Sequence, residues 1–125
     1  MSENSFSWQG NCGRWYEFEV VRAQRDWAPE GGVYMFVKPK DQAPVNPFGP
    51  PSDHWGGPIA LFIAKTDDFS TTLARHEMWR AAENLGAKEI HLLVIRDAQT
   101  RQQVEHDLLE AQSPILNRNM LRRVA

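Results

Sequence analysis

Residues 59–86, IALFIAKTDDFSTTLARHEMWRAAENLG, decide the fold because the spacing of their apolar side chains changes within them. Residues 59–65 are almost uniformly apolar, which is typical of a short strand covered on both faces, so we expect a central strand there. From Asp68 to Leu85 the apolar residues recur at helical spacing, and Gly86 follows at the position of a C-terminal cap. The stretch therefore predicts a central strand followed by a helix.

Further strands and a second helix are predicted on either side of this unit. Residues 15–22 alternate apolar and polar side chains, as in a half-buried or edge strand. Residues 33–37 and 89–95 are rich in strand-forming residues. Thr100 and Gln103 match a capping box at the start of the second helix. We expect an α+β fold, with helices flanking a small, mostly antiparallel sheet of three to four strands.

The length of 125 residues fits one domain. Residues 1–13 are mostly small and polar and predict an N-terminal arm, which leaves residues 14–125 as the domain. Residues 39–58 hold six of the eight prolines, which remove backbone donors and exclude a sheet strand. We expect a long surface loop there, either functional or simply inserted.

Charge and composition limit the function classes. The formal net charge of −2 argues against binding to nucleic acid through bulk positive charge, although it permits a local basic groove. A single cysteine, Cys12, excludes an internal disulfide and suits a reducing compartment. The longest apolar run, at residues 59–64, is too short to span a membrane, and residues 1–8 carry no signal-peptide core. We therefore expect a cytoplasmic protein that does not contact membranes.

Several common catalytic motifs are absent from the sequence. His76 and Glu77 begin like a zinc-protease helix, but Arg80 occupies the position of the second histidine ligand. The glycines form neither a dinucleotide-binding fingerprint nor a phosphate-binding loop. Ser70 and Ser113 lack the glycines of a hydrolase nucleophile elbow. These enzyme classes have no support in the sequence.

Five short motifs remain, and their mutual spacings form a pattern. In chain order they are Gly32-Val33-Tyr34, Phe62-Ile63-Ala64, His76, Glu105 and Pro114-Ile115-Leu116-Asn117. The most specific part is the last, in which a helical glutamate precedes the Pro-x-x-Asn segment by nine residues. On these residues, from about position 29 to position 117, the chain resembles the GIY-YIG nuclease domain. That α+β domain is found in homing endonucleases, some restriction enzymes and the excision-repair incision nuclease.

The resemblance implies an endonuclease, a hydrolase that cuts phosphodiester bonds with one divalent metal. Glu105 matches the metal ligand of the family and would hold Mg²⁺ or Mn²⁺, for which a carboxylate is a suitable ligand. Tyr34 matches the general base or water-positioning group, and His76 matches a histidine that assists proton transfer. Asn117 matches a substrate-binding position. The implied partner is a nucleic acid, with DNA favoured over RNA.

The sequence departs from the family pattern at three positions. Phe62 replaces a tyrosine and lacks its hydroxyl, and Ala64 replaces a glycine. Thr72 stands where the family has a catalytic arginine, which clamps the charge of the phosphate. Arg75, about one helical turn further on, is the candidate catalytic replacement. Lys65 is a second candidate cation, assigned to substrate binding.

These departures leave other hypotheses open. The scaffold could have lost its chemistry and act as a nucleic-acid-binding or protein-binding module. A third hypothesis is that the proline-rich loop binds a partner protein. Single residues also have structural interpretations: Tyr34 as a packing residue, Arg75 as a solvated charge and Asn117 as a turn-former. The oligomeric state is not predicted.

Overall fold

The computed structural model describes residues 5–22, 27–39, 58–74 and 76–118 of the chain. In this part lie five strands and three helices, followed by a helical turn at 115–118. In chain order they are β1 (Ser5–Gln9), β2 (Trp15–Val21), β3 (Gly32–Lys38), β4 (Ile59–Thr66), α1 (Phe69–Thr72), α2 (Glu77–Asn84), β5 (Glu89–Val94) and α3 (Ala98–Gln112).

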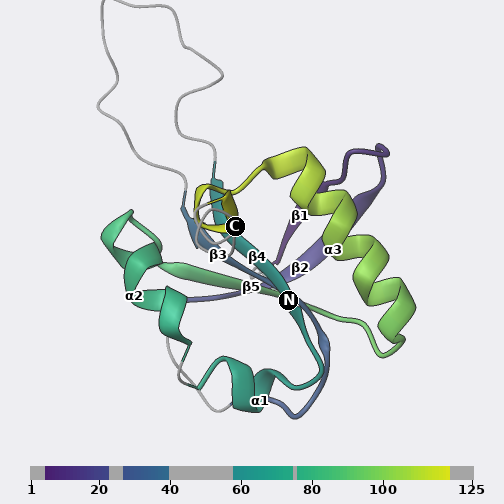
Figure 1. Ribbon diagram of the computed structural model, residues 1–125, viewed down its shortest axis with the longest axis horizontal. Helices are drawn as coiled ribbons and strands as arrows, with labels where there is room; N and C mark the ends of the chain where they lie inside the picture. The colour runs from purple at the N-terminus through teal and green to yellow at the C-terminus, as the bar shows by residue number, and fades with distance from the viewer. Residues whose placement is uncertain (1–4, 23–26, 40–57, 75, 119–125) are drawn as a thin grey trace, which may run out of the picture.

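The strands form one antiparallel sheet in the order β1-β2-β5-β3-β4 (Figure 1). The expected α+β fold with an antiparallel sheet is confirmed, but the expected number of three to four strands is wrong. The additional strand is β1, which lies in the segment expected to be an arm. Its Phe6 and Trp8 alternate with polar residues and pair with Phe18 and Tyr16 of β2. This short period-two alternation indicates a half-buried strand.

Each face of the sheet carries its own apolar core. Figure 1 shows α1 and α2 on one side of the strands and α3 on the other. The core beneath α1 and α2 includes Phe36, Phe62, Phe69, Leu73, Ala82 and Leu92. The core beneath α3 includes Trp8, Phe18, Met35, Ile63, Val104 and Leu108. Burial on both faces of the sheet follows from the alternating direction of side chains along each strand.

The strand β4 lies at an edge of the sheet, so its expected central position is wrong. Its apolar sequence reflects burial of both faces, because Phe62 enters one core and Ile63 the other. A register shift in the pairing with β3 leaves Leu61 as an extra residue between the pairs formed by Phe62 and Ala60. Such a bulge bends an edge strand and increases its twist.

The single helix expected from Asp68 to Leu85 is divided into α1 and α2. The first helix ends after one turn at Thr72, and the second begins after His76, whose backbone is extended. The Thr72 hydroxyl lies 2.6 Å from the hydroxyl of Thr66. This bond ties the last residue of α1 to the end of β4, where the first helix stops. His76 is consequently the N-cap of α2 and not an interior helix residue.

Of the three predictions made for helix ends, two are confirmed by the structure. The carboxylate of Asp97 accepts a hydrogen bond from the Thr100 N–H at 2.8 Å, so the N-cap of α3 is Asp97 and the expected capping box of Thr100 and Gln103 is wrong. Pro114 follows the end of α3, as expected. Gly86 follows α2 with φ of +106°, which confirms the expected C-terminal cap.

Some predictions concern residues that lie outside the described ranges. Residues 40–57, most of the expected loop at 39–58, and the candidate Arg75 lie outside the described residues. The predictions made for them stay predictions. Among the helices of the described part, none has both the length and the apolar character needed to span a bilayer.

Candidate functional site

Tyr34 and His76 meet on the side of the sheet that α2 covers. Tyr34 lies on β3, and His76 caps α2. The Tyr34 Oη and the His76 Nε2 are 2.7 Å apart, and the two rings meet edge to face with centroids 5.4 Å apart. Two residues that the family resemblance assigns to proton transfer therefore form a direct hydrogen bond, although 42 positions separate them in the sequence.

The position of the proton on His76 follows from its role as a helix cap. The Met78 N–H donates to the His76 Nδ1 at 3.1 Å. A neutral imidazole that accepts at Nδ1 carries its hydrogen on Nε2. The Nε2–H consequently donates to the Tyr34 Oη, and the phenol hydrogen of Tyr34 is available for another acceptor. Neutral His76 is thus a donor to Tyr34 and not its proton acceptor.

Burial moves the pKa values of both groups in the direction that favours the neutral forms. Tyr34 is 3% exposed, and its pKa is raised because burial, and then the negative charge of Glu105, disfavour the phenolate. The pKa of His76 is lowered because burial disfavours the imidazolium, an effect that Glu77 partly opposes. Both groups are therefore neutral near pH 7 in the free protein.

Glu105 and Lys65 form an ion pair on the other face of the sheet, the face that α3 covers. Glu105 projects from α3, and its Oε1 lies 3.7 Å from the Nζ of Lys65, near the end of β4. Lys65 directly follows Ala64, which pairs with Tyr34, so the Lys65 side chain points to the opposite face of the sheet from Tyr34. The side chains of Lys65 and Glu105 are 42% and 19% exposed. Such a partly exposed pair contributes at most about 1 kcal/mol, so Glu105 can exchange the lysine for another cation.

The fit of a divalent metal depends on Glu105. Within the described residues, no cluster of three or more histidine, cysteine or acidic side chains could hold a metal ion. Mg²⁺ is commonly held by one or two carboxylates together with waters and substrate phosphates. The residues present fit a metal of that kind, with Glu105 as its protein ligand, and they do not fit a metal enclosed by protein side chains.

Asn117 contacts the backbone of the edge strand. Its Oδ1 accepts from the Ile63 N–H at 2.9 Å, and its Nδ2 donates to the Ile63 carbonyl at 2.8 Å. The side-chain amide thus satisfies two backbone groups of β4, as a neighbouring strand would. Because both polar atoms of this amide are engaged, the geometry gives Asn117 a structural role in addition to the substrate-binding role predicted from the sequence.

Two positions at which the sequence departs from the catalytic residues of the resembled family, Phe62 and Thr72, make structural contacts. Phe62 stacks on Phe36 with ring centroids 5.5 Å apart. The hydroxyl of Thr72 bonds to that of Thr66 and helps to hold the end of α1 against β4. Neither position presents a charge to the Tyr34 hydroxyl. Arg75, the proposed substitute for the missing arginine, lies outside the described residues.

The sequence identified the members of the group but not their partners. It pointed to Tyr34, His76, Glu105 and Lys65 separately, and the structure joins them in two pairs, Tyr34 with His76 and Lys65 with Glu105, on opposite faces of the sheet. The charge of Glu105 acts on the Tyr34 pKa across the sheet. The contact of Met78 with the His76 ring was missed because His76 was expected inside a continuous helix. An N-cap signal was nevertheless present, since Glu77 provides the acidic residue that favours a first helical turn.

A second polar group, formed by Trp8, Glu89 and His91, lies on the opposite face of the sheet. None of its members was singled out from the sequence, and no family motif includes them. Comparisons of this chain with protein-family models, with curated proteins and with solved structures gave no match. The function must therefore be inferred from the geometry of the candidate site.

Proposed function

We propose that this protein is a divergent GIY-YIG-type nuclease that hydrolyses phosphodiester bonds of DNA or RNA with one divalent metal. The observation that carries the proposal is the 2.7 Å contact between Tyr34 and His76 within the electrostatic influence of Glu105. These residues come from β3, the start of α2 and α3. The motif resemblance selected all three residues without reference to their contacts.

In this proposal Tyr34 positions the attacking water, or deprotonates it after its own phenol proton has passed to solvent. The Nε2–H of His76 donates to the Tyr34 Oη and would stabilise a phenolate that forms there. The raised pKa of Tyr34 means that an additional positive charge is needed for deprotonation. A bound divalent metal would supply such a charge. Lys65 lies 3.7 Å from Glu105, and a substrate phosphate that drew Lys65 away would free Glu105 to hold the metal.

Glu105 would be the protein ligand of Mg²⁺ or Mn²⁺. When bound, such a metal polarises a phosphoryl oxygen and lowers the pKa of water. The phosphate would be steadied by Arg75 or Lys65 in place of the arginine that is absent at Thr72. DNA is the favoured substrate.

The test is a cleavage assay on single-stranded and double-stranded DNA and RNA with Mg²⁺ or Mn²⁺. We expect cleavage by the wild type and a loss of at least about 100-fold in Glu105→Gln and Tyr34→Phe. Glu110→Gln is the matched control, because Glu110 is an exposed glutamate of the same helix. Cleavage that persists in Glu105→Gln at the wild-type rate would refute the proposal.

A second candidate function is binding without catalysis. It is favoured by the packing of Phe62 against Phe36 and by the bond between Thr72 and Thr66, which leave two family positions without catalytic groups. In that case the same substrates bind in a salt-dependent manner, and no product forms with either metal. Metal-dependent turnover that Glu105→Gln abolishes would exclude this alternative.

A further inference from the structure

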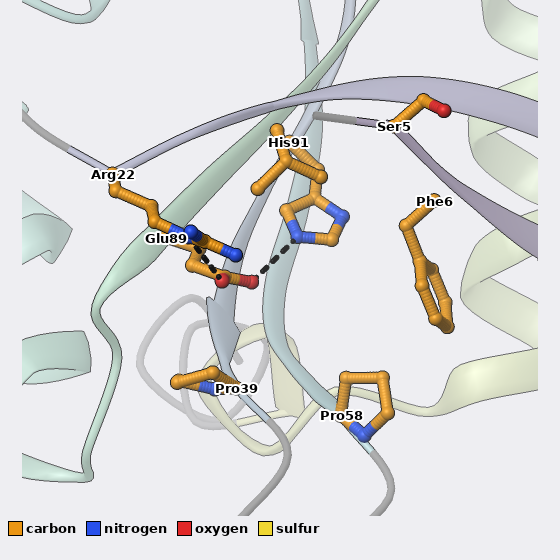
Figure 2. Close-up of a pocket in the computed structure, with 8 residues that line it drawn as sticks. Ser5, Phe6, Arg22, Pro39, Pro58, Glu89 and His91 are labelled. Carbon is orange, nitrogen blue, oxygen red and sulfur yellow. Dashed lines mark hydrogen bonds and ion pairs between the residues drawn. The ribbon is translucent and has the colours of Figure 1, made fainter. Parts of the chain in front are cut away.

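A chain of hydrogen bonds connects β1, β5 and the end of β2 on the face of the sheet that α3 covers. The Trp8 Nε1 lies 2.9 Å from the His91 Nδ1, and the His91 Nε2 lies 3.1 Å from the Glu89 Oε1. The other carboxylate oxygen, Oε2, accepts from the Arg22 Nε at 3.2 Å. Figure 2 shows Glu89 between Arg22 and His91.

When His91 is neutral, the hydrogen atoms in this series of hydrogen bonds can be arranged in only one way. An indole nitrogen only donates hydrogen bonds, so the His91 Nδ1 must accept from Trp8. The hydrogen of the neutral imidazole is therefore on Nε2 and is donated to Glu89. A proton added to Nδ1 would set two N–H donors against each other across the 2.9 Å contact.

This contact matters because Trp8 is the residue that anchors β1 in the core beneath α3. Trp8 is the only buried residue of β1, and among the strands that the structure describes β1 lies at an edge with β2 as its one neighbour. The turn of the hairpin, next to Trp8, is held by separate bonds, since the carboxylate of Asp107 on α3 accepts from the Cys12 N–H at 2.9 Å and from the Tyr16 hydroxyl at 2.7 Å. Loss of the Trp8 contact would therefore weaken the attachment of β1, whose other connection to the sheet is its pairing with β2.

A solvent-accessible cavity gives a route by which a proton can reach His91. The cavity has a volume of about 290 Å³, and Figure 2 shows His91 at its wall although the residue as a whole is only 1% exposed. Its lining residues are Ser5, Phe6, Val20, Arg22, Pro39, Pro58, Glu89 and His91. Because β1 supplies two of these residues, movement of β1 would also open the cavity.

From this geometry we infer that His91 is a pH-sensitive latch, which holds β1 on the sheet when neutral and releases it when a proton from solvent binds Nδ1. The change is an acid–base step only, in which the lone pair of Nδ1 takes the proton and the hydrogen bond from Trp8 is lost. Release leaves the outer edge of β2 without its partner strand and open to another strand.

The charges around His91 act in opposite directions. From β5, Glu89 faces the ring directly and favours its protonation, and Arg22 at the end of β2 partly neutralises Glu89. The neighbours across the sheet are Val20 on β2 and Met35 on β3, which are uncharged. Burial is the largest influence and lowers the pKa of His91 in the closed state, whereas the attraction of Glu89 raises it.

The direction of the pH dependence follows from this lowered pKa. In the open state His91 is solvated and titrates near its ordinary pKa of about 6.5, so the open state binds more protons than the closed state as the pH falls. The equilibrium constant for opening therefore rises below about pH 6.5, by at most about tenfold for each pH unit. Above this range the latch stays closed.

Amide hydrogen exchange of the full chain at about pH 7.5 and about pH 5 tests the latch. We expect the protection factors of residues 5–9, which correct for intrinsic exchange, to fall by about tenfold or more at the lower pH. The amides of residues 33–37 in β3 should keep their protection. Unchanged protection in β1, or an equal loss in β3, would overturn the proposal.

Variants separate His91 from the other titrating groups. In His91→Gln the side-chain amide can accept a hydrogen bond and donate one but does not titrate near neutral pH, so β1 should lose its pH response. His106→Gln is the control, because His106 is exposed and pairs with Glu110 on the surface of α3. In Trp8→Phe the opposing donor is removed, and the pH response of residues 5–7 should shrink. If both latch variants respond to pH as the wild type does, the assignment of His91 is wrong.

Discussion

The amide of Asn117 allows a sharp distinction between a structural and a substrate-binding role. Asn117→Ala removes two hydrogen bonds to the Ile63 backbone, of 2.9 and 2.8 Å, from the outer edge of β4. It also detaches the helical turn at 115–118 at the point where Leu116 enters the core. We therefore expect a loss of stability that is independent of any ligand.

The size of the effect follows from the number of bonds. A typical intramolecular hydrogen bond contributes about 1 kcal/mol net, so two bonds contribute about 2 kcal/mol. With an unfolding entropy of about 2.1 cal/mol/K per residue, a chain of 125 residues has about 0.26 kcal/mol/K. The melting temperature of Asn117→Ala should therefore fall by about 8 °C.

Thermal unfolding followed by circular dichroism is the assay. Asn117→Asp should be at least as destabilising as Asn117→Ala, because a carboxylate can accept from the Ile63 N–H but faces the Ile63 carbonyl without a hydrogen to donate. Asn84→Ala is the matched control. Asn84 is an exposed asparagine at the end of α2, and its replacement should change the stability by less than about 0.5 kcal/mol.

The opposite pattern would refute this reasoning. If Asn117→Ala melts with the wild type, the two amide bonds do not stabilise β4. If such a stable variant also loses affinity for nucleic acid, the substrate-binding role predicted from the sequence is supported at the expense of the structural one. Loss of stability with unchanged affinity would establish the structural role alone.

Three further predictions concern stability. Gly10→Ala should lower the unfolding free energy by about 1 to 3 kcal/mol in urea, because its Cβ would collide with the Asp107 carboxylate; an unchanged midpoint would show that the turn can move. Arg101→Met should cost about 2 to 3 kcal/mol, because this buried guanidinium donates to two backbone carbonyls, and urea unfolding at wild-type values would contradict it. The unfolding free energy should also fall as the pH decreases below about 6.5, since His76 and His91 have lowered pKa values and the unfolded chain binds more protons. Urea titrations across this range should show a smaller fall in unfolding free energy for the double variant His76→Gln/His91→Gln than for the wild type. An equal fall would assign the pH dependence to other groups.

The α+β class could be predicted because periodicity is a local signal. Alternation in β2, the apolar run of β4 and the capping glycine at Gly86 all lie within short segments of sequence. The position of a strand within the sheet is not local. β4 appeared central because Phe62 and Ile63 are both buried, but burial of faces does not reveal whether a strand has one neighbour or two.

The division of the expected helix was harder to predict because its interior has neither proline nor glycine. The bond between Thr66 and Thr72 joins the end of β4 to α1, so it exists only once both elements are in place. The same holds for the site. The motif spacing selected Tyr34, His76 and Glu105, whereas the proton arrangement on His76 depends on a helix that starts directly after it.

The placement of β5 between β2 and β3 has a consequence for the order in which the chain can fold. β1 pairs with β2, and β3 pairs with β4. Because the strands of each pair are consecutive in the sequence, each pair can form soon after it is synthesised. The two strand pairs are not connected until β5 lies between them. Leu92 of β5 then pairs with Glu19 of β2 on one side and with Tyr34 of β3 on the other. Pairing across such long sequence separations is slow. On the ribosome, the N-terminal hairpin must wait with an open edge until residues 89–94 emerge, and a destabilised β5 would leave two separate sheets with unpaired strands prone to aggregation.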